Sequence, residues 1–340
     1  MFKGLLKKVI DGRKLTEDEA KQAMDLIMSG EATSSQIASL ITVLRFRGET
    51  IEEMTGFVRS MKEHAVTLRH GMEVMDTCGT GGDGASTFNI STASAIVLSS
   101  LGVKVAKHGN RAMSSKSGSA DVLEFLGIPI QTNAEDAVAA LRNKNMCFLF
   151  APLYHVSMKH AASPRKEIGF RTIFNLLGPL ANPANSKRQL IGVFDTNIAE
   201  KMAKTLRNLG TERAVFVTGG DGLDECSITT FTDIVTLDHG EITRTRMTPE
   251  DVGLTYGILE DIQVESVEES GRLISEVFAG RGNVSAFNTL VLNAGAGLFA
   301  AEQVESIAEG VREAAKVIRD GRTYDHLRIL QENRKVEHHA

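Results

Sequence analysis

The segment Gly79–Gly84 carries four glycines and Asp83 directly after a short apolar run. Glycines lack a Cβ atom, so their backbone N–H groups can approach a phosphate closely. A helix is expected to begin near Asn89, and its N-terminus would add unpaired donors and the positive end of its dipole. The pattern favours an anion-binding loop, and a plain tight turn between a strand and a helix is the alternative.

Two nucleotide-binding motifs match this segment only in part. Gly79, Gly81 and Gly84 have the spacing of the dinucleotide fingerprint, but the next apolar run ends in Lys107-His108, where an acidic residue is required. Gly79 and Gly84 also have the spacing of a P-loop, but Ala85-Ser86 follow in place of Lys and Ser/Thr. Both motifs therefore lack the residues that carry their chemistry.

A second polar segment, Lys107–Ser119, follows the next apolar run. It contains three cations, two glycines and several hydroxyl or amide side chains. Such a segment offers point charges and directional hydrogen-bond donors to a polyphosphate. A solvated surface loop is the alternative interpretation.

The third segment, Gly219–Glu225, ends in the adjacent carboxylates Asp224 and Glu225. Acidic pairs are common in solvated turns, so this pair alone is weak evidence. Together with two phosphate-binding segments, however, the pair indicates a metal site, because Mg²⁺ usually takes one or two carboxylates together with waters and substrate phosphate oxygens. The three segments together predict a magnesium–phosphate site.

Composition excludes several classes of protein. The net charge of −5 lacks the basic footprint of a general nucleic-acid binder. Cys78, Cys147 and Cys226 form no CxxC pair or zinc-ligand pattern, which favours a reduced, intracellular setting. The apolar patch in residues 1–15 is too short for a signal peptide, and no run approaches 18 apolar residues. We expect a soluble, cytoplasmic protein.

The elements that position these segments change character along the chain. Residues 16–28, 34–47 and 51–64 have helical periodicity, so the first seventy residues are expected to be helical. Beyond Gly71, short apolar runs alternate with helical stretches, which predicts a mostly parallel sheet covered by helices. The expected strands lie at residues 73–76, 103–106, 146–150, 190–194 and 214–217.

Three further segments complete the expected architecture. Residues 163–183 interrupt the alternation with helical spacing bounded by prolines, and we expect them to pack with the N-terminal helices. Residues 232–247 have a β-hairpin pattern around Asp238-His239-Gly240. Four amphipathic helices are expected from about Ser266 onward.

The three polar segments also carry a family resemblance. Gly79–Asp83, Lys107–Arg111 and Gly222–Glu225 resemble, in order and spacing, the three signature loops of the anthranilate phosphoribosyltransferases. The similarity extends through residues 114–121, 154–159 and 171–180, and so covers nearly the whole chain.

The resemblance implies a magnesium-dependent transferase of tryptophan biosynthesis. The phosphoribosyl group of phosphoribosyl pyrophosphate (PRPP) would pass to the amine of anthranilate, giving N-(5-phosphoribosyl)anthranilate and pyrophosphate. It also implies an α/β fold of the nucleoside phosphorylase and phosphoribosyltransferase type. A small helical domain, residues 1–70 joined by 164–184, would adjoin a larger α/β domain, 71–340, with a mostly parallel sheet flanked by helices. PRPP would lie between the domains, and a homodimer would form through the helical domain.

The resemblance further assigns site residues. PRPP would bind to Gly79, Gly82, Asp83, Thr87, Asn89, Ile90, Ser91, Thr92, Lys107, His108, Gly109, Asn110, Arg111, Ala112, Met113, Ser114, Ser115 and Ser119. Two magnesium ions would be held with the help of Ser91, Asp224 and Glu225. Anthranilate would contact Gly79, Asn110 and Arg165, whose planar guanidinium can grip a carboxylate with two hydrogen bonds.

The expected chemistry is mainly positional and electrostatic. An aromatic amine is a free base at neutral pH, so we assign no general base and expect no covalent intermediate. His108 could act as a base, but a binding role fits equally well. Val156 and Ser163-Pro164 depart from many relatives and concern the shape of the anthranilate pocket.

Two other functions remain as alternatives. A pyrimidine nucleoside phosphorylase shares the expected architecture but has a Lys-His-Ser run before its first glycines, where this chain has Thr77-Cys78. A nucleic-acid-binding relative of the same fold would be basic, whereas this chain is acidic and keeps the Asp224-Glu225 pair.

Overall fold

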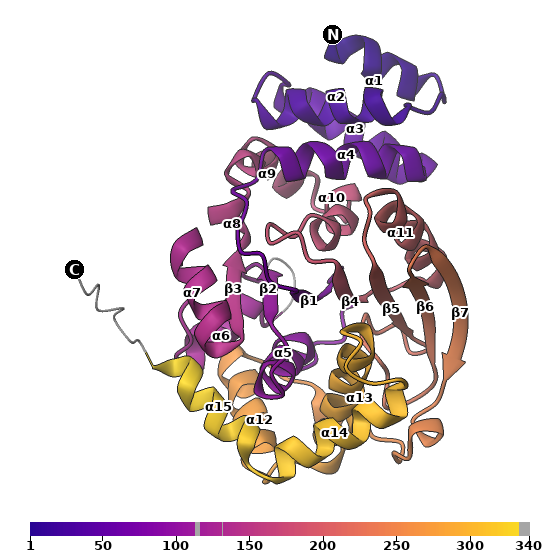
Figure 1. The fold of residues 1–340 in the computed structure, drawn as a ribbon. Coiled ribbons are helices and arrows are strands. Elements are labelled where there is room, and N and C mark those ends of the chain that lie inside the picture. The colour runs from indigo at the N-terminus through magenta and orange to yellow at the C-terminus, as the bar shows by residue number, and fades with distance from the viewer. Residues whose placement is uncertain (113–115, 131, 333–340) are drawn as a thin grey trace, which may run out of the picture.

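The molecule consists of a helical layer at the N-terminal end and a larger α/β body beneath it (Figure 1). The computed structural model describes residues 1–112, 116–130 and 132–332. The helical layer begins with α1 (Phe2–Ile10), α2 (Glu17–Met28), α3 (Ser34–Arg47) and α4 (Ile51–Glu63). The sequence predicted the last three of these helices at closely similar positions.

Local capping explains why α2, α3 and α4 begin where they do. Thr16, Thr33 and Thr50 each accept a hydrogen bond from the backbone amide three residues later. A Glu or Gln side chain at that later position accepts one in return, which forms a capping box. Each helix start is therefore encoded within four residues of sequence.

The proline-bounded segment returns to the helical layer. It forms α9 (Lys159–Ile168) and α10 (Ile173–Leu177), which lie between the N-terminal helices and the α/β body (Figure 1). α9 packs against α2 and α3, whereas α10 packs against α3 and α4. This is the packing that the sequence predicted for residues 163–183.

A seven-stranded sheet forms the centre of the α/β body. Its spatial order is β3-β2-β1-β4-β5-β6-β7, with parallel pairing from β3 to β5 and antiparallel pairing from β5 to β7. The strands are β1 (Met75–Gly79), β2 (Val105–Gly109), β3 (Met146–Phe150), β4 (Arg188–Gly192), β5 (Arg213–Gly219), β6 (Thr232–Asp238) and β7 (Glu241–Met247). The prediction of a mostly parallel sheet is confirmed.

Three predicted strand positions were wrong by a few residues. β4 begins and ends two residues earlier than the predicted 190–194. β1 and β2 begin later than residues 73 and 103, and they extend through Gly79 and Gly109. The last residues of β1 and β2 are mostly polar or glycine, so apolar patterning does not predict them as strand. Their backbones still pair in the sheet, Gly79 with Gly192 and Gly109 with Phe150. Lys107 and His108 therefore lie inside a strand rather than in the loop after it.

The β6–β7 connection is a two-residue turn. His239 and Gly240 have φ angles of 45° and 94°, and Asp238 pairs directly with Glu241. Positive φ at both central residues is the requirement of the tight turn whose twist matches a hairpin. The predicted hairpin is confirmed.

Helices cover both faces of the sheet. They are α5 (Ile90–Ser100), α6 (Ser119–Phe125), α7 (Ala134–Lys144), α8 (Ala151–Tyr154), α11 (Thr196–Asn208), α12 (Val267–Phe278), α13 (Val284–Ala300), α14 (Ile307–Arg319) and α15 (Arg322–Gln331). Short 3₁₀ turns lie at Val156–Met158, Gly178–Leu180, Glu250–Val252 and Glu260–Ile262. α12 to α15 are the four helices that the sequence predicted after Ser266.

The hydrophobic core is divided by the sheet. One large cluster includes Ile96 of α5 and Val291 of α13. The other joins Phe57 of α4 to Phe216 of β5 and Leu237 of β6. The helical layer and one face of the sheet thus share a continuous core, which fixes the helical layer above that end of the sheet.

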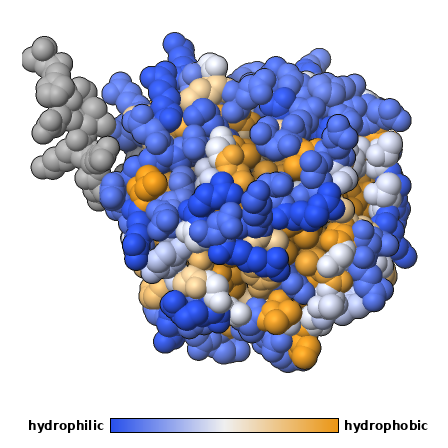
Figure 2. Space-filling view, turned by 60° about the horizontal axis from the view of Figure 1, so that its bottom comes forward, coloured by the Kyte–Doolittle hydropathy of each residue, from blue (hydrophilic) through white to orange (hydrophobic). Residues whose placement is uncertain are grey.

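Figure 2 turns the end of the molecule opposite the helical layer toward the viewer. Hydrophilic side chains cover most of this face, and hydrophobic ones form separate patches. α14 contributes the exposed cations Arg312, Lys316 and Arg319. Over residues 1–112, 116–130 and 132–332, no helix is both long and apolar enough to cross a membrane.

Candidate active site

One pocket brings the three polar segments together. It lies where β1, β2 and the loop after β5 end at the same edge of the sheet, and it encloses about 300 Å³. Most residues predicted to bind PRPP or metal line it: Gly79, Gly82, Asp83, Thr87, Asn89, Ile90, Ser91, Lys107, His108, Gly109, Asn110, Arg111, Ala112, Ser119, Asp224 and Glu225. Met113, Ser114 and Ser115 lie outside the described residues.

The first wall of the pocket is the glycine loop. Gly81 and Gly82 have φ angles of 70° and 75°, a region that side chains strain to adopt. The backbone N–H of Gly81 donates a 2.6 Å hydrogen bond to Oδ2 of Asp224. A Cβ atom on Gly79 would lie 2.5 Å from the same oxygen. The loop therefore needs glycine both for its backbone turn and for the close approach of Asp224.

The N-terminus of α5 forms the adjoining wall. The side chain of Asn89 accepts a hydrogen bond from the backbone N–H of Thr92, which caps the helix. Its Nδ2 donates to the carbonyl of Ser117, and Ser119 Oγ donates to its Oδ1. Asn89 thus links the helix start to the second polar segment, while the first amides of α5 remain near the pocket.

Lys107 is a buried cation at the pocket floor. Its Nζ donates to the carbonyl of Thr77 at 2.5 Å and to Oγ of Ser91 at 3.1 Å. Only 1% of the residue is exposed, and this burial lowers the pKa of the ammonium. The ammonium therefore orients the hydroxyl group of Ser91, a predicted metal-binding residue.

His108 is buried and unprotonated. Burial and the neighbouring His155 lower its pKa to about 3. Its backbone N–H donates to Oδ1 of the buried Asp76, and its Nε2 has no hydrogen-bond partner among the described residues. The neutral ring could accept a proton, but the low pKa makes it a weak base. This environment favours a role in shaping the pocket.

The acidic pair has the properties of a cation site. Burial and the nearby carboxylate of Asp83 raise the pKa of Asp224 to about 7, and burial together with Asp224 raises that of Glu225. Neither carboxylate forms an ion pair with Lys or Arg in the described part of the chain. A divalent cation would supply the missing positive charge, so these residues and Ser91 fit magnesium.

Asp121 holds the middle of the second segment, at Arg111 and Ala112. Arg111 donates to Asp121 at 2.7 Å and to Glu124 at 2.9 Å, and the backbone N–H of Ala112 also donates to Asp121. The guanidinium of Arg111 is therefore already engaged by carboxylates. Its backbone and that of Ala112 line the pocket, whereas its charge is directed toward α6.

Two predicted binding residues do not line this pocket. Thr92 is buried within the first turn of α5. Arg165 lies on α9, where its guanidinium stacks over the ring of Phe174 at 5.1 Å and burial lowers its pKa. The structure thus places Arg165 in the helical layer rather than on the pocket wall.

Sequence reasoning missed several residues that line the pocket. They are Cys78, Thr80, Gly81, Ser86, Phe88, Lys116, Ser117, Gly118 and Asn175. Asn175 comes from α10, and its side chain also accepts a hydrogen bond from the backbone N–H of Thr172. The sequence signal for Asn175 was the Thr172–Asn175 capping pattern, which indicates a helix start and does not by itself indicate a binding site.

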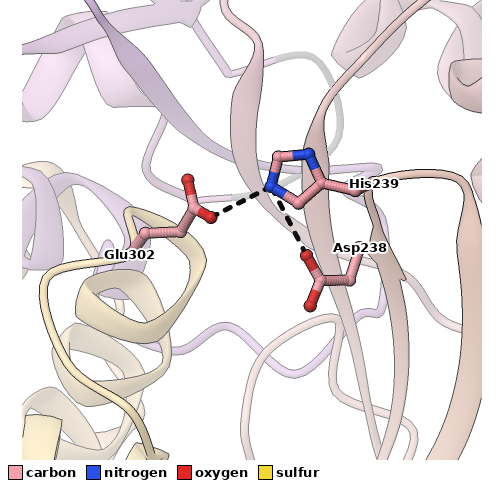
Figure 3. A group of neighbouring side chains, drawn as sticks. All are labelled: Asp238, His239 and Glu302. Atoms are coloured by element: carbon pink, nitrogen blue, oxygen red, sulfur yellow. Dashed lines mark hydrogen bonds and ion pairs between the residues drawn. The ribbon is translucent and has the colours of Figure 1, made fainter.

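A second group of titratable side chains lies at the β6–β7 turn. Asp238, His239 and Glu302 point toward one another (Figure 3), with His239 Nε2 3.3 Å from a Glu302 oxygen. Arg213 forms a 3.1 Å ion pair with Asp238, and Arg188 forms one of 2.5 Å with Glu302. Guanidinium groups therefore already compensate these carboxylates, and we assign no metal to them.

Comparisons with known proteins agree with this architecture. Residues 3–65 match the helical bundle domain of a glycosyl transferase family, and residues 71–324 match its a/b domain. The chain is therefore a member of this glycosyl transferase family.

Individual relatives narrow the assignment. The anthranilate phosphoribosyltransferase of Geobacillus kaustophilus is 60% identical over 331 residues, which cover 97% of this chain and 98% of the relative. That of Thermus thermophilus has a solved structure with 38% identity and a TM-score of 0.89, covering 96% of this chain and 98% of its own. The chain belongs to the anthranilate phosphoribosyltransferases.

A more distant solved structure carries ligands. It is the anthranilate phosphoribosyltransferase of Saccharomyces cerevisiae in complex with PRPP and Mg, 26% identical with a TM-score of 0.87. The similarity covers 97% of this chain and 96% of the yeast chain.

Proposed function

We propose that this protein transfers the phosphoribosyl group of PRPP to the amine of anthranilate, in tryptophan biosynthesis. The observation that carries the proposal is a single pocket in which a glycine loop, a helix N-terminus, a buried lysine and two uncompensated carboxylates meet. Family membership adds the acceptor, because the relatives with high identity are anthranilate phosphoribosyltransferases.

The pyrophosphate of PRPP would bind at the glycine loop and the start of α5. Backbone N–H groups of Gly82 and Asp83 and the first amides of α5, at Ile90 and Ser91, supply donors for its oxygens. Lys107 holds Ser91 in place, and Asn89 ties this wall to the second segment. The remaining predicted residues, Thr87, His108–Ala112 and Ser119, would enclose the ribosyl and phosphate groups.

Ser91, Asp224 and Glu225 would hold magnesium, with two ions as our proposed number. When bound, magnesium neutralises negative charge on the leaving pyrophosphate. The protein's own contribution is positional, because Gly81 holds the carboxylate of Asp224 and Gly192 lets the backbone of Asp224 approach β4 closely. A Cβ on Gly192 would lie 1.5 Å from the carbonyl oxygen of Asp224.

Anthranilate would approach from the side of the helical layer. Gly79 and Asn110 line the pocket, and Arg165 would bind the anthranilate carboxylate. In the structure Arg165 stacks on Phe174 instead, so this role requires its guanidinium to leave that ring and turn toward the pocket. Alignment of the amine with the ribosyl carbon then accounts for most of the expected rate enhancement.

The domain division and the assembly are also proposals. We assign residues 1–70 and 164–184 to a helical domain and the rest of 71–340 to the PRPP-binding domain. We propose a cytoplasmic homodimer formed through the helical domain, because Phe46 of α3 is 93% exposed and Ile10 of α1 is 60% exposed. Light scattering on the purified protein tests the dimer, and a monomer at micromolar concentration would contradict it.

A fluorescence assay tests the proposed reaction. Purified protein is mixed with magnesium, PRPP and anthranilate, and consumption of anthranilate is followed by the loss of its fluorescence. We expect turnover that stops when PRPP or magnesium is left out. No turnover with anthranilate, together with phosphorolysis of a pyrimidine nucleoside, would overturn the proposal.

A further inference from the structure

Arg171 lies beside the glycine loop although it belongs to another part of the chain. It directly precedes Thr172, the residue that caps α10, and it is half-buried. A Cβ atom on Gly82 would lie 2.6 Å from its Nε and 2.9 Å from one of its terminal nitrogens. The guanidinium therefore touches the backbone of the loop at the point where the loop lacks a side chain.

An aromatic ring holds the guanidinium in this position. Phe194, which follows β4, has its ring centroid 4.6 Å from Cζ of Arg171. A guanidinium at this distance is attracted by the face of the ring. Phe194 and Gly82 thus both contact the Arg171 side chain and restrict where it can point.

The charge of Arg171 has no partner of its own. Across residues 1–112, 116–130 and 132–332, the guanidinium takes part in no hydrogen bond or ion pair. Arg111, by comparison, is engaged by Asp121 and Glu124. Arg171 therefore has donors free for an anion at the glycine loop.

We propose that Arg171 is a further donor-binding residue, whose guanidinium binds a pyrophosphate oxygen of PRPP held at the glycine loop. The proposal rests on the proposed function and adds a residue to it. A guanidinium suits this task because its planar N–H groups form charge-assisted hydrogen bonds with phosphate oxygens.

Arg171 also connects substrate binding to the helical layer. The arginine lies at the start of α10, and α10 packs against α3 and α4. The glycine loop, in contrast, extends from β1, an interior strand of the sheet. A pyrophosphate bound by both would be held by residues from these two parts of the molecule.

Binding of inorganic pyrophosphate with magnesium tests the proposal without turnover. Isothermal titration would compare the wild-type protein with Arg171→Gln, which removes the charge, and Arg171→Lys, which keeps it without the planar fork. The matched control is Arg319→Gln, because Arg319 also stacks on a phenylalanine, Phe287 at 5.2 Å, but belongs to α14 and does not contact the glycine loop.

We expect Arg171→Gln to weaken pyrophosphate binding by about 10- to 100-fold, as for loss of a hydrogen bond to a charged group. The KM for PRPP should rise by a similar factor with the KM for anthranilate unchanged, and Arg171→Lys should give a smaller loss. If Arg171→Gln fails to fold, the pyrophosphate affinity of Arg171→Lys tests the proposal in its place. Unchanged pyrophosphate affinity in a folded variant, or a changed magnesium requirement alone, overturns the proposal.

Failure of this inference differs from failure of the proposed function. Wild-type protein that consumes anthranilate while the Arg171 variants keep their pyrophosphate affinity contradicts the inference alone. Wild-type protein that binds pyrophosphate through Arg171 but does not consume anthranilate contradicts the proposed acceptor alone.

Discussion

Replacing Gly82 with alanine tests how tightly the glycine loop and Arg171 fit together. Two costs are expected. The residue has a φ of 75°, which costs a residue with a side chain about 1–2 kcal/mol. The new Cβ would also lie 2.6 Å from Nε of Arg171, so the guanidinium must leave its position against Phe194. Loss of that stacking costs about 0.5–2 kcal/mol more.

Gly84→Ala is the matched control for Gly82→Ala. Gly84 has a φ of 78°, close to that of Gly82, but a Cβ there would meet nothing within 4 Å. Both variants therefore share the cost of the backbone conformation, and only Gly82→Ala adds the collision. At about 1.4 kcal/mol per factor of ten, Gly82→Ala should raise the KM for PRPP about 2- to 30-fold more than Gly84→Ala.

The assay is the KM for PRPP at saturating anthranilate and magnesium, with thermal unfolding of each variant measured alongside. We expect both variants to unfold a few degrees below the wild type, because both carry the strain of the backbone conformation in the folded state. Equal KM values for Gly82→Ala and Gly84→Ala would refute the reasoning, since backbone strain alone would then explain both.

Four further variants test the metal site, the anthranilate contact and the pH dependence of stability. Asp224→Asn and Glu225→Gln should raise the magnesium concentration for half-maximal rate at least about 10-fold, and an unchanged magnesium curve would contradict the metal assignment. Arg165→Ala should raise the KM for anthranilate about 10- to 100-fold, whereas the exposed neighbour Lys166→Ala should not; equal values would refute that role. His326 has a pKa lowered by burial to about 4 from 6.5. The unfolded chain therefore binds this proton more tightly, and stability falls by about 2–3 kcal/mol as pH drops from 6.5 to 4. Denaturant titrations should show this loss reduced in His326→Gln, and identical pH profiles would count against it.

Much of the candidate site could be predicted because its residues are local in sequence. The glycines at 79–84 and the pair Asp224-Glu225 each follow a strand. The carboxyl ends of parallel strands lie at a common edge of the sheet. Segments that each follow such a strand therefore meet in one pocket, even when they are distant in sequence. The helix starts were equally accessible, since each capping box spans only four residues.

Other residues could not be predicted because their position depends on packing between segments. Asn175 and Arg171 have ordinary local settings at the start of α10. They reach the pocket or its rim only because α10 docks between the helical layer and the sheet. The burial of Lys107 could not be predicted for the same reason. A lysine at the end of an apolar run suggests a loop, and only the fold places the acceptors Thr77 and Ser91 beside its ammonium.

The strand order has a consequence for how the chain folds. β1 is an interior strand, and one of its neighbours, β4, comes more than a hundred residues later along the chain, after α9 and α10. Such distant pairing is slow to form and leaves a strand edge open until its partner is available. During synthesis, α1 to α4 would emerge long before α10 and β4 can complete their core. We therefore expect the pocket to form late, and the incomplete sheet to be the stage most prone to aggregation.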